Sequence, residues 1–199
     1  MTLVEASWPL LVFVVAGLFS PGPNVVMLTA SGARFGFRAT VPHLLGVPVG
    51  TGLLAAASAL GLGAVLLAMP ALKLTFQIIA AGWILWLAWR IAQAARAGQA
   101  TDRGRPFAFL QAVGFQAVNP KIWAVTLAAA AGFGIGLPPV QEALRLFVVF
   151  AGVNLCVCLF WTTAGHLLAP VLARPPVWRA FMVTMAVLLA LTVILIFAG

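Results

Sequence analysis

The chain reads Ser20-Pro21-Gly22-Pro23-Asn24 in the middle of a long apolar stretch that carries no charge. A comparable interruption, Val118-Asn119-Pro120-Lys121, lies in a second long apolar stretch. Proline lacks a backbone N–H and clashes with the preceding helical turn, so each motif predicts a break in a helix. We expect a new helix to begin at each motif, with Ser20 and Asn119 as N-caps and proline directly after them.

The composition around these motifs is that of a membrane protein. The 199 residues are 64% hydrophobic and 7% charged, whereas a soluble domain carries about 25% charged residues. Eleven basic and three acidic residues give a net charge of +8, and the charges lie between apolar stretches rather than in a basic stripe with aromatics. We therefore expect a lipid bilayer around the protein and no nucleic-acid partner.

The chain divides into six segments that are long enough to cross a membrane, since a span needs about 20 apolar residues. The predicted fold is an all-α membrane protein of about six transmembrane helices. Both interrupted helices are about 30 residues long, or about 45 Å, against a hydrocarbon core of about 30 Å, and a break removes this excess. The predicted helices cover residues 5–33, 41–68, 71–92, 107–136, 143–169 and 178–198.

The basic residues predict the orientation in the membrane. The loops of one side hold only Lys73 and Arg145, together with Glu5 and Glu142. The positive-inside rule places the other, more basic side in the cytoplasm, so both termini face the periplasm. The first span follows no basic segment, and we expect it to be retained rather than cleaved as a signal peptide. The cytoplasmic set is Arg34, Arg38, Arg90, Arg96, Arg103, Arg105, Arg174 and Arg179.

The two breaks occupy matching places in two halves of the chain. A polar cytoplasmic loop, residues 94–106, divides a single transmembrane domain, residues 1–199, into residues 1–93 and 107–199. With three spans per half, the second half enters the membrane from the opposite side, which predicts two inverted three-helix repeats. Any protein of six spans can be divided in this way, so the count alone is weak evidence. Paired interrupted helices in the two halves are the better indication, because they mark the binding sites of secondary transporters. The alternative is that each proline only kinks a helix for packing.

The predicted substrate site comprises the residues at the two breaks. Lys121 is a cation inside an otherwise uncharged span, where a charge is costly and usually functional. Beside the positive end of a half-helix it suits a carboxylate or another anion, unless it snorkels to the membrane surface. Asn24 and Asn119 are candidate ligands for polar substrate groups, or else partners of the interrupted backbone. The full predicted set is Pro21, Gly22, Pro23, Asn24, Asn119, Pro120, Lys121 and Asn154.

Three polar residues away from the breaks leave two interpretations open. Asn154 lies in the middle of the fifth span and either faces the same cavity or bonds to a neighbouring helix. His43 and His166 lie toward the cytoplasmic ends of their spans. Either histidine could titrate during a transport cycle, or both simply lie at the membrane interface.

Small and aromatic residues indicate how the spans pack. The spacings Gly46-x-x-x-Gly50 and Gly132-x-x-x-Gly136 allow close helix contacts, either within the protein or in a homodimer. Tryptophans recur at near-helical spacing beside Arg90, which is typical of anchors at the membrane interface. They are Trp83, Trp86 and Trp89.

Taken together, these motifs resemble the lysine exporter (LysE/RhtB) family of amino-acid exporters over essentially the whole chain. The resemblance rests on the motif at 20–24, Gly36-Phe37-Arg38, Gly46 with Gly50, and Asn119-Pro120-Lys121. Residues 85–92 and 164–167 are similar to the branch that exports cysteine and O-acetylserine. The resemblance implies a bacterial inner-membrane exporter of small amino acids or derivatives, of the cysteine, O-acetylserine or threonine/homoserine type, driven by the proton motive force.

One position departs from the family pattern. Members often carry an acidic residue after the second glycine of the second span, and here Thr51 follows Gly50. Glu5, Asp102 and Glu142 lie near helix ends or in loops, so no acid lies deep in a predicted span. A cationic substrate is therefore disfavoured, a small neutral amino acid is the predicted substrate, and the proton carrier is unidentified.

Other classes of function fit the sequence less well. An intramembrane enzyme needs a nucleophile paired with a base, and no nucleophile motif frames Ser20, Ser31 or Ser58. A metal-ion exporter needs carboxylates or a His/Cys cluster, whereas Cys156 and Cys158 point to different faces of a helix. We predict a transporter without a cofactor or resident metal, with export of another small solute as the alternative.

Overall fold

The computed structural model describes residues 3–20, 22–61, 68–97 and 105–197. Every regular element among these residues is helical, which confirms the predicted all-α class. In chain order the elements are α1 (Leu3–Phe19), α2 (Pro23–Phe35), α3 (Phe37–Ala59), α5 (Pro70–Ala97), α6 (Phe109–Ala117), α7 (Pro120–Gly132), α8 (Pro139–Leu168), the 3-10 turn η1 (Val171–Ala173) and α9 (Pro175–Phe197).

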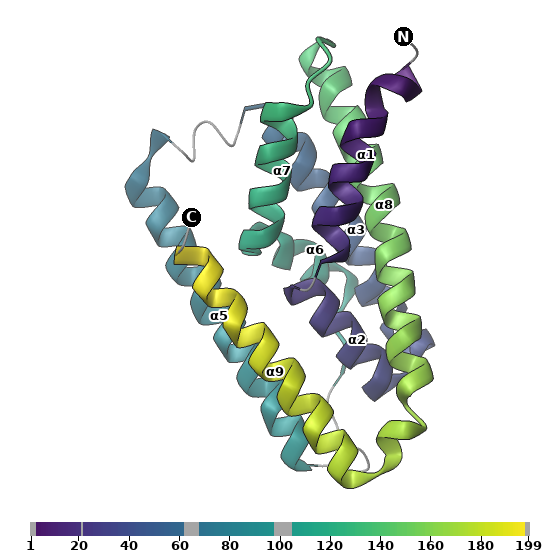
Figure 1. Ribbon diagram of the computed structural model, residues 1–199. Helices are drawn as coiled ribbons and strands as arrows, with labels where there is room; N and C mark the ends of the chain where they lie inside the picture. Colours follow the sequence, from purple (N-terminus) through teal and green to yellow (C-terminus); the bar gives the residue numbers. More distant parts are fainter. Residues whose placement is uncertain (1–2, 21, 62–67, 98–104, 198–199) are drawn as a thin grey trace.

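The helices form a bundle and a separate hairpin. The long helix α8 runs the length of the bundle and packs chiefly on α3 and α2 (Figure 1). Helices α5 and α9 lie side by side as the hairpin, and α9 joins it to the bundle by packing on α2. Their shared core contains Met27 of α2, Ile84 of α5 and Met182 of α9. The short helix α2 therefore packs against both α8 and the hairpin.

Both predicted helix breaks are present. Helix α1 ends at Phe19, and α2 begins at Pro23 with its axis turned by 57°. Helix α6 ends at Ala117, and α7 begins at Pro120. Each new helix starts with a proline in its first turn, where the missing N–H would have no helical partner.

The first break differs from the prediction in one detail. Gly22, and not Ser20, is the N-cap of α2, while the Ser20 Oγ donates to the Gly17 carbonyl at 2.9 Å, back in α1. The cause is the second proline of the motif, because a residue that precedes proline is disfavoured in the helical conformation. Gly22 is accordingly extended (φ 179°, ψ −179°), and α2 cannot begin before Pro23.

Several described helices are suited to a membrane. Three are long and apolar enough to cross one, namely α3, α8 and residues Pro175–Ile194 of α9. Residues Ser7–Phe19 and Pro23–Phe35 make a fourth span if the bent pair crosses as one unit. Six spans in two inverted repeats stay a prediction.

Some predicted helix ends are wrong by several residues. Helix α3 already begins at Phe37, and α5 continues to Ala97, so the first residues of the predicted loop 94–106 are helical. Helix α8 begins at Pro139, before its apolar part. The polar residues at these ends do not stop the helix, because a helix can extend beyond the hydrocarbon core into water. The rest of the predicted loop up to 104 lies outside the described residues.

Glycines allow the close contacts inside the bundle. A Cβ on Gly46 or Gly50 of α3 would collide with the backbone of α6, so this glycine pair serves internal packing. Likewise, a Cβ on Gly165 of α8 would collide with the Thr29 carbonyl of α2. The second predicted pattern, Gly132 to Gly136, is not a helical face, because α7 ends at Gly132.

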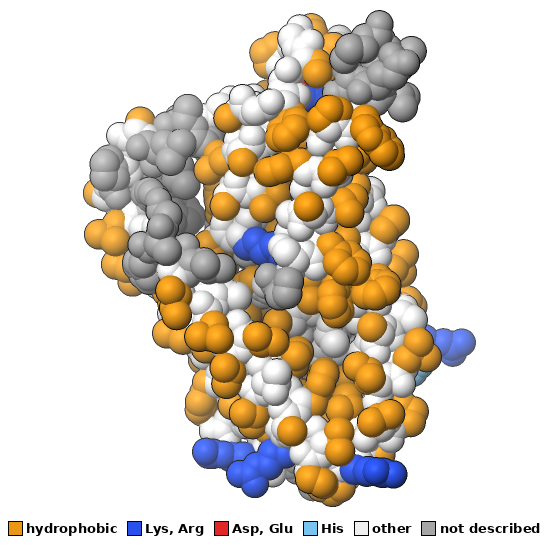
Figure 2. Space-filling view, viewed as in Figure 1, with side chains coloured by type: hydrophobic (Ala, Val, Ile, Leu, Met, Phe, Trp, Pro, Cys, Tyr) orange, Lys and Arg blue, Asp and Glu red, His pale blue; other side chains and the backbone are white. Residues whose placement is uncertain are grey.

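The molecular surface separates apolar from charged side chains. In Figure 2, hydrophobic side chains are spread over the visible face, and Lys and Arg side chains gather chiefly at the lower end. Helix α5 ends and α9 begins at this end (Figure 1). We call it the basic end. Large apolar side chains on the described surface, such as Trp8, Leu110 and Ile194, are more than half exposed, which suits a lipid environment.

Candidate functional site

The two helix breaks meet in the interior of the bundle. Asn24 in the first turn of α2 and Gln116 in the last turn of α6 are both buried and exchange two hydrogen bonds. The Asn24 amide donates to Gln116 Oε1 at 2.8 Å, and Gln116 Nε2 donates to Asn24 Oδ1 at 3.2 Å. Gln116 Nε2 also donates to the Ala112 carbonyl at 2.9 Å, which fixes its orientation.

Asn119 lies at the second break with an unused acceptor. It is the N-cap of α7, as predicted, and it is fully buried, but its side chain makes no capping bond. Its Nδ2 is 3.5 Å from Gln116 Oε1. Its Oδ1 has no hydrogen-bond partner among the residues that the structure describes. An unpaired buried acceptor is costly, so this oxygen is suited to receive a donor from a ligand.

Lys121 links the second break to the first. Its side chain is half-buried, and its Nζ donates to the Ser20 carbonyl, which the end of α1 leaves without a helical partner. It lies over Gly22, where an added Cβ would come within 2.6 Å of Lys121 Cδ. The ammonium group therefore points to the first break, which favours the binding-site interpretation of Lys121 over snorkelling to the membrane surface.

A second side chain from α7 satisfies the backbone at its own break. The Trp123 indole donates to the Ala117 carbonyl at 2.8 Å, at the end of α6. Interrupted helices inside a membrane need such partners for their freed carbonyls. The first two turns of α7 thus stabilise both breaks, through Lys121 at one and Trp123 at the other.

Asn154 fits both of its predicted interpretations. Its Nδ2 donates to Thr51 Oγ1 of α3 at 2.8 Å, which is an interhelical hydrogen bond. Its Oδ1 is 3.5 Å from the Cys158 Sγ, one turn further along α8. Asn154 also lines the same small cavity as the asparagines of the two breaks.

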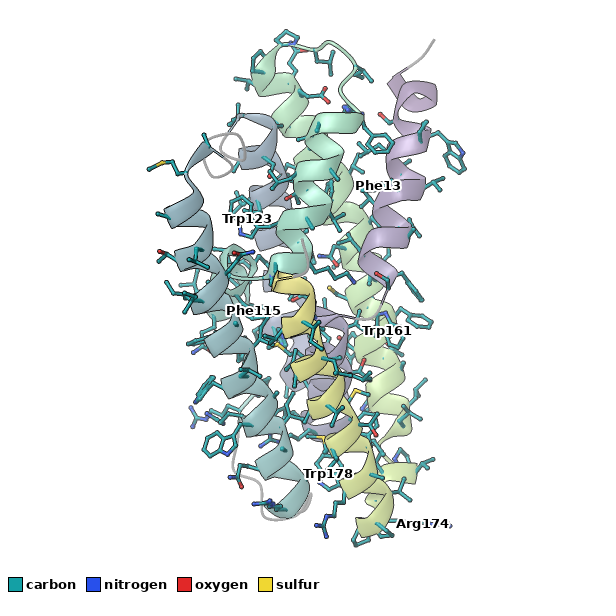
Figure 3. The ribbon with its side chains drawn as sticks, turned by 60° about the vertical axis from the view of Figure 1, so that its left-hand side comes forward. Phe13, Phe115, Trp123, Trp161, Arg174 and Trp178 are labelled. Atoms are coloured by element: carbon teal, nitrogen blue, oxygen red, sulfur yellow. The ribbon has the colours of Figure 1, made fainter. Side chains whose placement is uncertain are left out.

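This cavity collects the polar residues predicted for the site. Its volume is about 10 Å³, close to the minimum for one water molecule. Trp161 closes one side, beside the end of α1 (Figure 3), and its ring centre is 5.4 Å from that of Phe19. The lining residues are Leu18, Asn24, Val25, Leu28, Asn119, Lys121, Ile122, Asn154, Val157, Cys158 and Trp161.

The other predicted site residues have different places. Gly22, Pro23 and Pro120 shape the breaks and do not line the cavity. Pro21 lies outside the described residues. His166 is exposed at the end of α8, whereas His43 is buried against Phe107.

The charge at the small cavity is positive. Lys121 is its charged lining residue, and no Asp or Glu is present among the described residues that line it. The described part of the chain also contains no group of His, Cys, Asp and Glu side chains that could hold a metal ion. The available chemistry is a cation, an open amide acceptor and apolar walls.

Sequence reasoning missed two residues of this network, Gln116 and Thr51. Gln116 carries a signal that could have been used, because it is a polar residue in an apolar span, one helical turn before Asn119. Thr51 stands out in the sequence only as a departure from the family pattern, and its bond to Asn154 could not be foreseen because that residue lies on a helix far away in sequence. The geometry defines a class of protein: a buried polar site between two interrupted helices is typical of secondary transporters.

Comparison with known proteins agrees with this class. The LysE type translocator family matches residues 15–198. A cysteine/O-acetylserine efflux protein of Salmonella choleraesuis is 30% identical over 175 residues, and one of Klebsiella pneumoniae is 32% identical over 172 residues, each alignment covering 83% of both chains. One of Escherichia coli is 28% identical over 176 residues, covering 83% of this chain and 84% of its own. No solved structure matches.

The chain belongs to the LysE type translocator family. It is a membrane transporter and not an enzyme, as the sequence predicted.

Proposed function

We propose that this protein is a secondary active exporter of small neutral amino acids or their derivatives, of the cysteine and O-acetylserine type. The observation that carries the proposal is the buried cavity at which Asn24, Asn119, Lys121 and Asn154 come together between the two helix breaks. The named relatives are cysteine/O-acetylserine efflux proteins, which supports this substrate class over threonine or homoserine.

The lining groups suit a zwitterion. The Lys121 ammonium, at the positive N-terminal end of α7, suits the substrate carboxylate. The open Oδ1 of Asn119 suits the substrate ammonium, which needs an acceptor. A cationic side chain would find no carboxylate among the described lining residues. A small neutral side chain is better matched to the apolar walls, Val157 and Trp161 among them.

Transport requires that the site opens. A cavity of about 10 Å³ does not hold an amino acid, so the helices around it must separate to admit one. We propose that the substrate carboxylate takes Lys121 from the Ser20 carbonyl. This exchange removes the bond between α7 and the end of α1, which is one of the contacts that hold the two breaks together. Differential binding of this kind is what lets a ligand shift a conformational equilibrium.

The proposed topology, location and energy source of the exporter are those predicted from the sequence. Six spans in two inverted three-helix repeats rock about the site in alternating access. The protein lies in the bacterial inner membrane with both termini in the periplasm and uses the proton motive force. The basic end then faces the cytoplasm, where the substrate enters.

Export from intact cells tests the proposal. Cells that overexpress the chain should release cysteine or O-acetylserine faster than cells without it, and a protonophore should abolish the difference. Threonine serves as the comparison substrate. Lys121→Ala should reach the membrane and lose export. Lys121→Met, which keeps the unbranched apolar stem but not the ammonium group, should lose export equally if the charge is what matters.

Two results would count against the proposal. Export at the parental rate by Lys121→Ala, in protein shown to be in the membrane, would remove Lys121 from the mechanism. Release of none of the three amino acids by the parental chain would favour another small solute as the substrate.

A further inference from the structure

A second and larger cavity lies between the hairpin and the bundle. Its volume is about 640 Å³, and α2, α3, α5 and the segment before α6 supply most of its wall. It is distinct from the small cavity on the same helix, since Met27, Ala30 and Ser31 line it, whereas Asn24 and Leu28 line the other. We call it the seam cavity.

The charged groups among the described lining residues of the seam cavity are all of one sign. Arg34 of α2, Arg90 of α5 and Arg105 before α6 line it, and no Asp or Glu is found among its described lining residues. Arg34 lies 4.6 Å from the centre of the Phe35 ring, and Arg90 lies 5.2 Å from that of Trp86. Like charges around one cavity repel each other, and an anion bound between them reduces this repulsion.

The remaining polar groups of the seam cavity also favour an anion. The Ser31 hydroxyl bonds to that of Thr40, a residue behind the cavity wall, at 3.0 Å, and Gln111 Oε1 accepts from the Ala108 N–H at 3.0 Å. His43 is 2% exposed, and its Nδ1 has no hydrogen-bond partner among the described residues. An amino-acid ammonium would meet three guanidinium groups and engaged side-chain acceptors, so the substrate zwitterion does not suit this cavity.

The residues around the seam cavity suit the head group of a lipid, because exposed tryptophans and an apolar wall lie beside the arginines. Trp86 lines it and packs on Trp83 at 5.1 Å between ring centres, and both rings are exposed on α5. Exposed tryptophans of this kind lie at the level of the lipid head groups. Met27, Leu87 and Met182 add an apolar wall that suits an acyl chain. Basic pockets between transmembrane helices bind phosphate-bearing lipid head groups.

We propose that the seam cavity binds the phosphodiester head group of an anionic phospholipid. The phosphate is held by Arg34, Arg90 and Arg105, and His43 donates to it. Helix α5 packs chiefly on α9, so it has few direct contacts with α2. A phosphate shared by Arg90 and Arg34 therefore joins the hairpin to the half-helix that carries Asn24. This role is separate from the proposed export and does not depend on it.

Lipid binding to the purified full-length protein tests the proposal. Delipidated protein in detergent is titrated with phosphatidylglycerol, with zwitterionic phosphatidylethanolamine and with soluble glycerol 3-phosphate, and bound lipid is counted by native mass spectrometry. The cavity variant is Arg34→Gln/Arg90→Gln/Arg105→Gln. The matched control, Arg96→Gln/Arg174→Gln/Arg179→Gln, removes three arginines that do not line the cavity. Arg174 marks the basic end in Figure 3.

The expected result is that the parental chain and the control bind phosphatidylglycerol at least ~10-fold more tightly than the cavity variant does. Equal binding by all three proteins would overturn the proposal, as would equal binding of phosphatidylethanolamine. Binding of glycerol 3-phosphate as tight as that of the lipid would replace the lipid by a soluble phosphate ester. If the triple variant does not fold, Arg105→Gln against Arg174→Gln gives the same comparison, because both residues are exposed outside the α-helices.

Discussion

Asn24 and Gln116 exchange hydrogen bonds across 92 positions of the chain and join the first turn after one helix break to the last turn before the other. Each amide uses both a donor and an acceptor in this pair, at 2.8 and 3.2 Å. Because both side chains are buried, neither can turn to water if the other is removed. The pair therefore fixes the position of the two breaks relative to each other.

Truncating one member of this pair should destabilise the protein. Gln116→Ala leaves the buried amide of Asn24 without partners, and we expect a loss of about 1–3 kcal/mol in the free energy of unfolding. Asn24→Ala should cost a similar amount. The measurement is unfolding in detergent by denaturant, followed by tryptophan fluorescence.

The double variant Asn24→Ala/Gln116→Ala is the control for this interpretation. It removes both polar groups, so its loss should be smaller than the sum of the two single losses by about 1 kcal/mol or more. Strict additivity would mean that the two amides do not stabilise each other.

The sequence predicts the breaks because proline acts locally. Pro23 and Pro120 stop and start helices whatever surrounds them, and Lys121 is conspicuous because a cation inside an apolar span is rare. The pairing of Asn24 with Gln116 is not local. It depends on how two helices meet, and the sequence gives no register for that meeting. The same holds for Ser20, which resembles an N-cap but bonds back to Gly17 because the helix starts later.

Gly165 should tolerate no larger residue. Its Cα faces the backbone of Thr29 so closely that a Cβ would overlap the carbonyl, and neither backbone can move without separating α2 from α8. We expect Gly165→Val to lower the free energy of unfolding by about 3 kcal/mol, at the upper end of the range for overpacking, and to lower the yield of folded protein.

Gly152→Ala on the same helix is the matched control for Gly165. Nothing lies within 4 Å of a Cβ at Gly152, and alanine favours a helix by about 1 kcal/mol over glycine. This variant should be as stable as the parental chain or more so. A stable Gly165→Val protein in the same unfolding assay would show that the close approach of α2 and α8 is not needed.

Arg145 should hold the end of the molecule opposite the basic end. It pairs with Glu142 in the first turn of α8, donates to the Phe133 carbonyl at the end of α7 at 2.5 Å, and reaches the Ser7 Oγ of α1 at 3.3 Å. Three helix ends therefore meet at one guanidinium. We expect Arg145→Ala to raise hydrogen exchange at least ~10-fold in residues 133–138, equivalent to about 1.4 kcal/mol of local stability.

Arg145→Lys distinguishes charge from geometry at this position. Lysine keeps the charge but cannot reach three partners in a fork, so it should restore only part of the protection. Full protection in Arg145→Ala would mean that the loop between α7 and α8 is held by other contacts.

Asn119→Leu should separate stability from transport. Leucine has nearly the same shape as asparagine, and the Asn119 side chain makes no capping bond, while its Oδ1 is buried without a partner among the described residues. Removing an unpaired buried acceptor should leave the free energy of unfolding unchanged or raise it by about 1 kcal/mol.

If the Asn119 Oδ1 receives the substrate ammonium, the same change should abolish export of cysteine or O-acetylserine from intact cells. An unpaired buried oxygen lowers the stability of the protein without substrate. This is expected of a binding residue, because a hydrogen bond from the bound substrate offsets that loss. Unchanged export by a stable Asn119→Leu protein would remove Asn119 from the site, whereas a marked loss of stability would show that its amide already stabilises the fold, through its Nδ2 contact with Gln116 or through a partner of its oxygen.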